Sequence, residues 1–153
     1  MPLERNKALV RRFFEDAPYH PEVCDEIFAQ HLPWHSLYRS EHPDFISDPL
    51  TEKVAYAHHI QLWGGWSESI DELIAEGDRV MVRWTFRGKH QGEYLGIPPT
   101  GKEVTFCGIY IFRIADGRIA EAWNLWDQLG EWQQLGILTR SQQLLHPDVS
   151  GQG

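Results

Sequence analysis

The sequence predicts an α+β fold in which helices from the first half of the chain cover an antiparallel sheet built from the second half. Apolar residues recur at helical spacing in three segments before residue 64, and they alternate with polar residues at a period of two after residue 66. Helices followed by consecutive strands are typical of α+β rather than α/β proteins. We therefore expect a cone-shaped, curved antiparallel sheet wrapped around the N-terminal helices, with a pocket at the open end of the cone.

The three expected helices have recognisable starts and apolar faces. Residues 2–16 form an amphipathic pattern that ends in a Phe pair, and residues 21–30 begin with a proline, which suits a first helical turn. Residues 49–63 follow Asp48, a favoured N-cap residue, and carry His59 on an aromatic stripe. We expect a Gly-Gly pair to end this third helix.

Four long strands in two hairpins are expected next. The first hairpin covers SESIDELIAEGDRVMVRWTFRG, and the second covers KEVTFCGIYIFRIADGRIAEAWNLW. The stretch HLPWHSLYRS before them predicts only an irregular strand or loop. Residues 1–140 are expected to be a single domain, and residues 141–153 a polar C-terminal tail.

Composition excludes several classes of function. The formal net charge of −8 and the scattered basic residues argue against a nucleic-acid partner. No stretch is long and apolar enough to span a bilayer, and MPLERNKALV lacks the apolar core of a signal peptide, so we expect a cytoplasmic protein without a membrane partner. Cys24 and Cys107 are expected to stay reduced.

Motifs for metals and cofactors are missing as well. The chain has no HExxH, no Cys/His set at zinc spacing, no GxSxG and no phosphate-binding glycine loop. The pair His58-His59 is a poor metal site, because neighbouring residues on a helix point about 100° apart. We therefore expect no metal and no cofactor.

The aromatic content favours a hydrophobic cavity, since seven Trp, seven Phe and five Tyr are many for 153 residues. A cavity of this kind would bind a flat, hydrophobic small molecule. The expected substrate-binding residues are Trp34, Tyr38, Trp63, Cys107, Tyr110, Trp123 and Asn124.

Three titratable residues are the expected catalytic groups. Asp127 closes a strand rich in Trp and Leu, and strict alternation places it on the same face as Trp123. If that face lines the cavity, burial raises the carboxyl pKa and suits Asp127 to general acid/base catalysis. Alternatively, Asp127 caps the short helix that follows it. His35 and His59 are the other candidates, although a structural role is open for each.

One stretch of the chain resembles a known family. Residues 88–138 carry a GxHxGxxxGxPPTGK-like loop, a DGxIxExW turn and strand, and an Asp before QLG. NKALVRRFFED looks like the first helix of the same family. This combination resembles the SnoaL-like polyketide cyclase family.

The resemblance implies a nuclear transport factor 2-like, cystatin-like half barrel that assembles as a homodimer or homotetramer. It also implies a cofactor-independent intramolecular aldol cyclisation of an aromatic polyketide-like ligand, with Asp127 at the position of the family's acid/base. One departure is the segment Gly64-Gly65-Trp66-Ser67, where the family often carries a Phe-Pro-Asp-like motif.

Two other functions are compatible with this fold. A hydrolase like the epoxide hydrolases that share it would hold a water between Asp127 and Arg83 or Asn124, but no Asp-Arg-Asp set is evident in the sequence. A non-catalytic small-molecule-binding protein would use Asp127 only as a helix cap.

Overall fold

The structure is a computed structural model that describes residues 2–36 and 44–138. Tyr38 and the predicted tail lie outside the described residues. The helices and strands are, in chain order, α1 (Pro2–Glu15), the 3₁₀ turn η1 (Pro21–Val23), α2 (Cys24–Ile27), β1 (Leu32–Ser36), β2 (Phe45–Ser47), α3 (Pro49–Leu62), β3 (Trp63–Glu76), β4 (Arg79–His90), β5 (Glu103–Ala115), β6 (Arg118–Trp126) and α4 (Gln128–Leu135).

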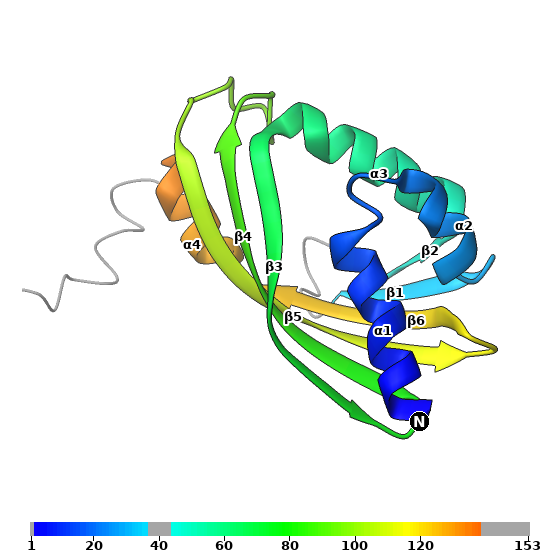
Figure 1. The fold of residues 1–153 in the computed structure, drawn as a ribbon. Coiled ribbons are helices and arrows are strands. Elements are labelled where there is room, and N and C mark those ends of the chain that lie inside the picture. Colours follow the sequence, from blue (N-terminus) through cyan, green and yellow to red (C-terminus); the bar gives the residue numbers. More distant parts are fainter. Residues whose placement is uncertain (1, 37–43, 139–153) are drawn as a thin grey trace, which may run out of the picture.

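A single curved sheet organises the described part of the chain. Its six strands follow the order β2-β1-β6-β5-β4-β3, and all pairs are antiparallel except β1 with β6. Figure 1 shows α1 and α3 on the concave side of this sheet and α4 at its far end. The predicted α+β class and cone-like shape are therefore confirmed.

Local chemistry explains where α1 and α3 lie. The buried face of α1 carries Val10, Phe13 and Phe14, as its amphipathic pattern predicts. Asp48 begins α3 by accepting a hydrogen bond from the Thr51 backbone N–H at 2.7 Å, which confirms the predicted cap.

Two predicted helix boundaries are wrong. The segment 21–30 forms only η1 and the single turn α2, because the backbone of Phe28 becomes extended and forms an isolated β-bridge with Ile119. Phe28 is thereby completely buried. At the other boundary, α3 ends at Leu62 and β3 begins at the next residue, so the Gly-Gly pair lies inside a strand.

The sheet also contains two short strands besides the four long ones that the sequence predicted. The segment predicted as an irregular strand or loop contains β1, which pairs with β6 through Trp34 and Ala122, and β2 adds an outer edge. The paired part of β1 is only five residues long. A strand this short has too few residues for a clear alternation of apolar and polar side chains, and Pro33 makes a strand prediction weaker still.

The sheet and helices enclose one apolar core. Phe13 is at its centre, with ring contacts to Phe28 at 5.6 Å and to Phe112 at 5.5 Å.

Within the described ranges, no helix is long and apolar enough to cross a membrane.

Candidate active site

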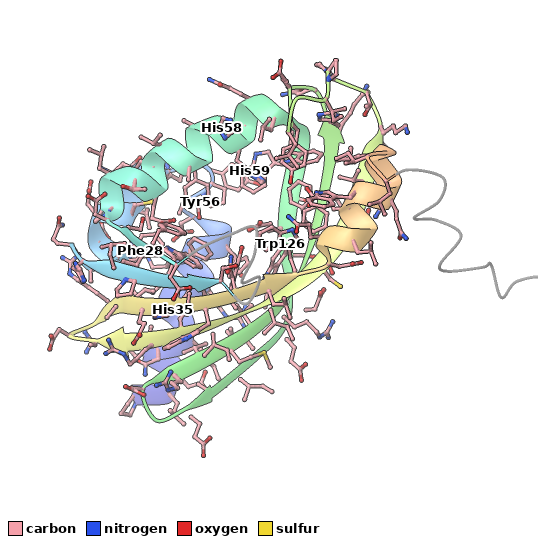
Figure 2. All side chains as sticks on the ribbon, turned by 180° about the vertical axis from the view of Figure 1, so that it is seen from behind. Phe28, His35, Tyr56, His58, His59 and Trp126 are labelled. Atoms are coloured by element: carbon pink, nitrogen blue, oxygen red, sulfur yellow. The ribbon has the colours of Figure 1, made fainter. Side chains whose placement is uncertain are left out.

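A cavity of about 200 Å³ lies between the helices and the concave face of the sheet. Figure 2 shows Tyr56 and His59 between α3 and the sheet, whereas the exposed His58 is directed elsewhere on the same helix. Most of the lining is aromatic, and two carboxyl groups project into it. The lining residues are Phe13, Trp34, Glu52, Ala55, Tyr56, His59, Trp66, Glu68, Tyr110 and Asn124.

A β-bulge directs Glu68 into this cavity. Gly64 pairs with Lys89 and Ser67 pairs with Arg87, so β3 contains one more residue than β4 across this interval. Gly65 accommodates the bulge with a φ of +57°, a conformation that glycine adopts without strain. An extra residue reverses the alternation of the strand, and Glu68 consequently shares the inner face with Trp63, which precedes the bulge.

Glu68 is a carboxyl group without a partner among the described residues. It makes no hydrogen bond or ion pair with any residue that the structure describes. Burial raises the pKa of Glu68 to about 7, because the cavity gives the charged form no compensating contact. Glu68 is therefore present both as an acid and as a base near neutral pH, which is the requirement for a general acid/base.

Glu52 is the second carboxyl group of the cavity, and it is held firmly. Its Oε1 atom accepts hydrogen bonds from Trp34 Nε1 at 2.8 Å and from Ser47 Oγ at 2.6 Å. Burial raises the pKa of Glu52, while these two hydrogen bonds oppose that effect. These two hydrogen bonds fix the position of the Glu52 carboxyl group in the cavity wall.

Tyr110 and Asn124 bring hydrogen-bond donors to the same cavity. They face each other across β5 and β6, so their side chains lie next to each other on the inner face. Neither side chain makes a hydrogen bond to another described residue. Burial, followed by the negative charges of Glu68 and Glu52, keeps the pKa of Tyr110 well above its usual value. The Tyr110 hydroxyl therefore remains a neutral donor.

His59 lines the cavity as a neutral imidazole. Burial, followed by the charge of the neighbouring His58, lowers the pKa of His59 to about 4. Its Nε2 atom is buried without a hydrogen-bond partner among the described residues. The ring is held edge-on by Trp66 at 4.7 Å and by Phe86 at 5.3 Å. An unpaired imidazole nitrogen in this position can bind a polar atom of a ligand.

Four of the predicted site residues are thus brought together around one cavity. His59, Trp34, Tyr110 and Asn124 all belong to its lining. Their catalytic or binding roles stay predictions, although the structure gives them a common location.

Asp127 does not face this cavity, so the expectation that it points inward with Trp123 is wrong. Asp127 is exposed, and its Oδ1 atom accepts a hydrogen bond from the Gly130 backbone N–H at 2.9 Å, which caps α4. From Glu121 onward the alternation along β6 was assigned correctly, but the inner face is the one that carries Ala122 and Asn124. The helices cover that face of the sheet and leave Asp127 outside. An extra residue between Ile119 and Glu121 shifts the register with β5, so Ile119 is buried like Ala122 and does not share the face of Trp123 as strict alternation predicted.

His35, Trp123 and Cys107 also lie away from the cavity lining. His35 stacks on Trp123 with ring centroids 5.1 Å apart, and its Nε2 is 2.9 Å from Glu121 Oε1. The hydrogen bonds to Asp44 and then to Glu121 raise the pKa of His35. Cys107 is exposed.

Six residues of the lining were not among the predicted site residues, namely Phe13, Glu52, Ala55, Tyr56, Trp66 and Glu68. For Glu68 a signal was available: after the two glycines, Trp66, Glu68 and Ile70 alternate with Ser67, Ser69 and Asp71, so that a Glu occupies the apolar face of a strand. Glu52 looks like an ordinary first-turn helix acid. Its function as a hydrogen-bond acceptor depends on Trp34 and Ser47, which only the fold brings close.

Comparison with known proteins agrees with this fold. A family model described as SnoaL-like polyketide cyclase matches residues 66–135. The aklanonic acid methyl ester cyclase DnrD of Streptomyces peucetius is 35% identical over 65 residues, which are 42% of this chain and 45% of that protein. The chain therefore spans less than half the length of the curated relatives that it matches.

Solved structures extend the similarity to most of the chain. IdmH from Streptomyces antibioticus, assigned as a polyketide cyclase, is 25% identical with a TM-score of 0.72, over 86% of this chain and 98% of that one. A SnoaL-like polyketide cyclase from Agrobacterium tumefaciens shares the fold, with 14% identity, a TM-score of 0.66, and coverage of 83% and 95%. These matches agree with the resemblance predicted from the sequence: residues 66–135 are similar to the SnoaL-like polyketide cyclase family, and the solved structures share the nuclear transport factor 2-like fold of the chain.

Proposed function

We propose that the chain is a cofactor-independent enzyme that moves protons at a carbon next to a carbonyl group of a small hydrophobic compound. The observation that carries this proposal is Glu68, a carboxyl group on the cavity wall that pairs with no residue in the described part of the chain and has a pKa of about 7. Glu68 replaces Asp127 as the proposed acid/base, because Asp127 is exposed and caps a helix.

In the proposed reaction, the ionised Glu68 removes a proton from the carbon beside the carbonyl. Negative charge then develops on the carbonyl oxygen, and the Tyr110 hydroxyl and the Asn124 amide are the available donors to stabilise it. The resulting enolate carbon attacks a second carbonyl of the same molecule, and a carbon–carbon bond closes the ring. The protonated Glu68 returns its proton to the new alkoxide, so that the carboxylate is regenerated.

The remaining lining explains why such a step suits this cavity. Trp34, Trp66 and Phe13 present flat apolar surfaces that bind an aromatic or conjugated ligand and exclude water. The neutral His59 can orient a polar substituent through Nε2. The predicted homodimer or homotetramer remains a prediction.

The test is deuterium exchange at the carbon beside a ketone. With 2-tetralone as the probe in D₂O, we expect exchange catalysed by the wild type, followed by NMR, with kcat/KM rising as the pH increases through about 7. Glu68→Gln should abolish the catalysis, while Glu76→Gln, an exposed change at the end of the same strand, should leave it intact. Retention of full activity in Glu68→Gln contradicts the proposal.

A second experiment separates the proposal from hydrolysis. In ¹⁸O-labelled water, a hydrolase would place solvent oxygen in its product, whereas aldol closure needs none. Among the described residues that line the cavity there is no arginine to pair with a water-activating carboxylate. Arg83, the predicted water-positioning residue, instead lies 3.5 Å from Asp71 and Glu72.

A further inference from the structure

A surface groove of about 400 Å³ adjoins the cavity and shares two residues with it. The groove lies where the end of α1, the end of α3 and the start of β3 meet. Trp66 and Glu68 belong to both linings. The groove residues are Phe14, Pro18, Tyr19, Ile60, Trp63, Gly64, Gly65, Trp66, Ser67, Glu68 and Gln91.

Trp66 lies between the cavity and the groove. Its ring stacks on Tyr56 and on Phe86, each at 6.4 Å, and meets the edge of His59 at 4.7 Å. These contacts come from α3 and β4, so they fix the indole between the helix and the sheet. A ligand that reaches Glu68 from the groove therefore passes along the Trp66 ring.

The outer walls of the groove are apolar and accessible. Tyr19 is 73% exposed and Ile60 is 47% exposed, although both are large apolar side chains. At Gly65 the floor of the groove carries no side chain, and a Cβ there would meet no atom within 4 Å, whereas the Gln91 side chain packs against Gly64. Exposed apolar walls above an open glycine floor suit a flat ring.

The charged and hydrogen-bonding residues of the two linings restrict the kind of ligand that the groove can bind. Neither lining contains a lysine or arginine among the described residues, and both contain Glu68, so an anionic group is disfavoured. The Gln91 amide already donates to the Ile60 carbonyl oxygen at 2.9 Å. Apart from Ser67, Glu68 and Gln91, the groove lining consists of apolar and aromatic side chains and glycine backbone.

Size indicates that the cavity alone is too small for the whole ligand. Pockets for drug-sized ligands usually measure about 300–1,000 Å³, whereas the cavity holds about 200 Å³. Together, the cavity and the groove fall within that range.

We propose that the groove is a second binding subsite, which takes an uncharged aromatic ring of the same ligand whose carbonyl group lies beside Glu68. This inference rests on the proposed function, since it extends the ligand from the proposed reaction centre. It assigns Tyr19, Ile60 and Trp66 to the recognition of ligand size rather than to chemistry.

Two ketone probes test the subsite by calorimetric binding. Acetophenone fits the cavity alone, and 4-acetylbiphenyl adds one ring for the groove. We expect the wild type to bind 4-acetylbiphenyl about tenfold more tightly or better, because the second ring buries additional apolar surface. Ile60→Glu and Tyr19→Ser, on opposite walls, should each remove this preference and leave acetophenone binding unchanged.

A matched control lies on the same helix. Val54 is an exposed apolar residue of α3, 61% exposed, and belongs to neither lining. Val54→Glu should therefore keep the preference. The subsite is wrong if the wild type has no preference for the longer probe, or if the preference survives both groove substitutions. Binding is measured without turnover, so the failure of Glu68 as a catalyst would appear separately, in the exchange assay.

Discussion

Replacing Glu68 with Gln should stabilise the fold above neutral pH, because folding leaves this carboxylate only partly accessible to water and no described residue pairs with it. Its pKa rises from 4.5 to about 7 on folding. At 1.36 kcal/mol for each pKa unit, the ionised side chain lowers the free energy of unfolding by about 3 kcal/mol. Gln keeps the shape of the side chain and lacks the charge, so the variant escapes this cost.

The sign of the effect depends on pH. Below pH 4.5 the Glu68 carboxyl is protonated in both the folded and the unfolded state, so it makes no difference to stability. Between pH 4.5 and about 7 the unfolded chain loses this proton while the folded chain keeps it, so the free energy of unfolding falls as the pH rises. Above about pH 7 both states are ionised and the cost is constant.

Urea unfolding of the wild type and Glu68→Gln at pH 4, 5.5, 7 and 8.5 measures this difference. We expect the two proteins to be nearly equal at pH 4 and the variant to be more stable by about 3 kcal/mol at pH 8.5. Glu76→Gln, at the exposed end of the same strand, should follow the wild type throughout. If the difference between Glu68→Gln and the wild type does not change with pH, Glu68 is not an unpaired buried carboxyl group and the reasoning fails.

Three further predictions concern other side chains. Asp127→Ala should lower the free energy of unfolding by about 1 kcal/mol in urea titrations, because the cap on Gly130 is lost, while Asp127→Asn keeps both stability and turnover. A stable Asp127→Asn without turnover would instead restore the catalytic role to Asp127. Tyr110→Phe should reduce the kcat for ketone exchange about 100-fold without a matching loss of folded protein, since it removes an enolate donor; an unchanged kcat excludes that role. His35→Gln should be less stable than the wild type at pH 6 but equal to it at pH 9 by thermal unfolding, because a raised histidine pKa stabilises the fold only below that pKa; a constant difference between these pH values would contradict this.

Much of the fold was predictable because its signals are local. The cap by Asp48, the buried Phe pair of α1 and the two hairpins each depend on residues close together in the chain. The start of β3 was missed because the glycines after Leu62 look like a helix stop, while the backbone uses them for a bulge.

The site was harder to predict, because it depends on which face of the sheet the helices cover. The sequence placed Asp127 and Trp123 correctly on one face of β6, and alternation alone could not show that this face is the outer one. Asn124 lies on the opposite face of β6, which the helices cover, and it therefore lines the cavity. The acceptor role of Glu52 needed a partner 18 residues away in the chain, which no local pattern reveals.

The bulge at Gly65 has a consequence for how relatives of this chain should be compared. Because the residue inserted there reverses the alternation of the strand, the number of residues between Trp63 and the acid determines whether that acid reaches the cavity. A relative without the insertion would turn a glutamate at the aligned position toward solvent, even with an identical sequence on either side. In a sequence alignment through this strand, the gap should therefore be placed at the glycines. Only then can the role of an acidic residue in one protein be assigned to the aligned residue of another.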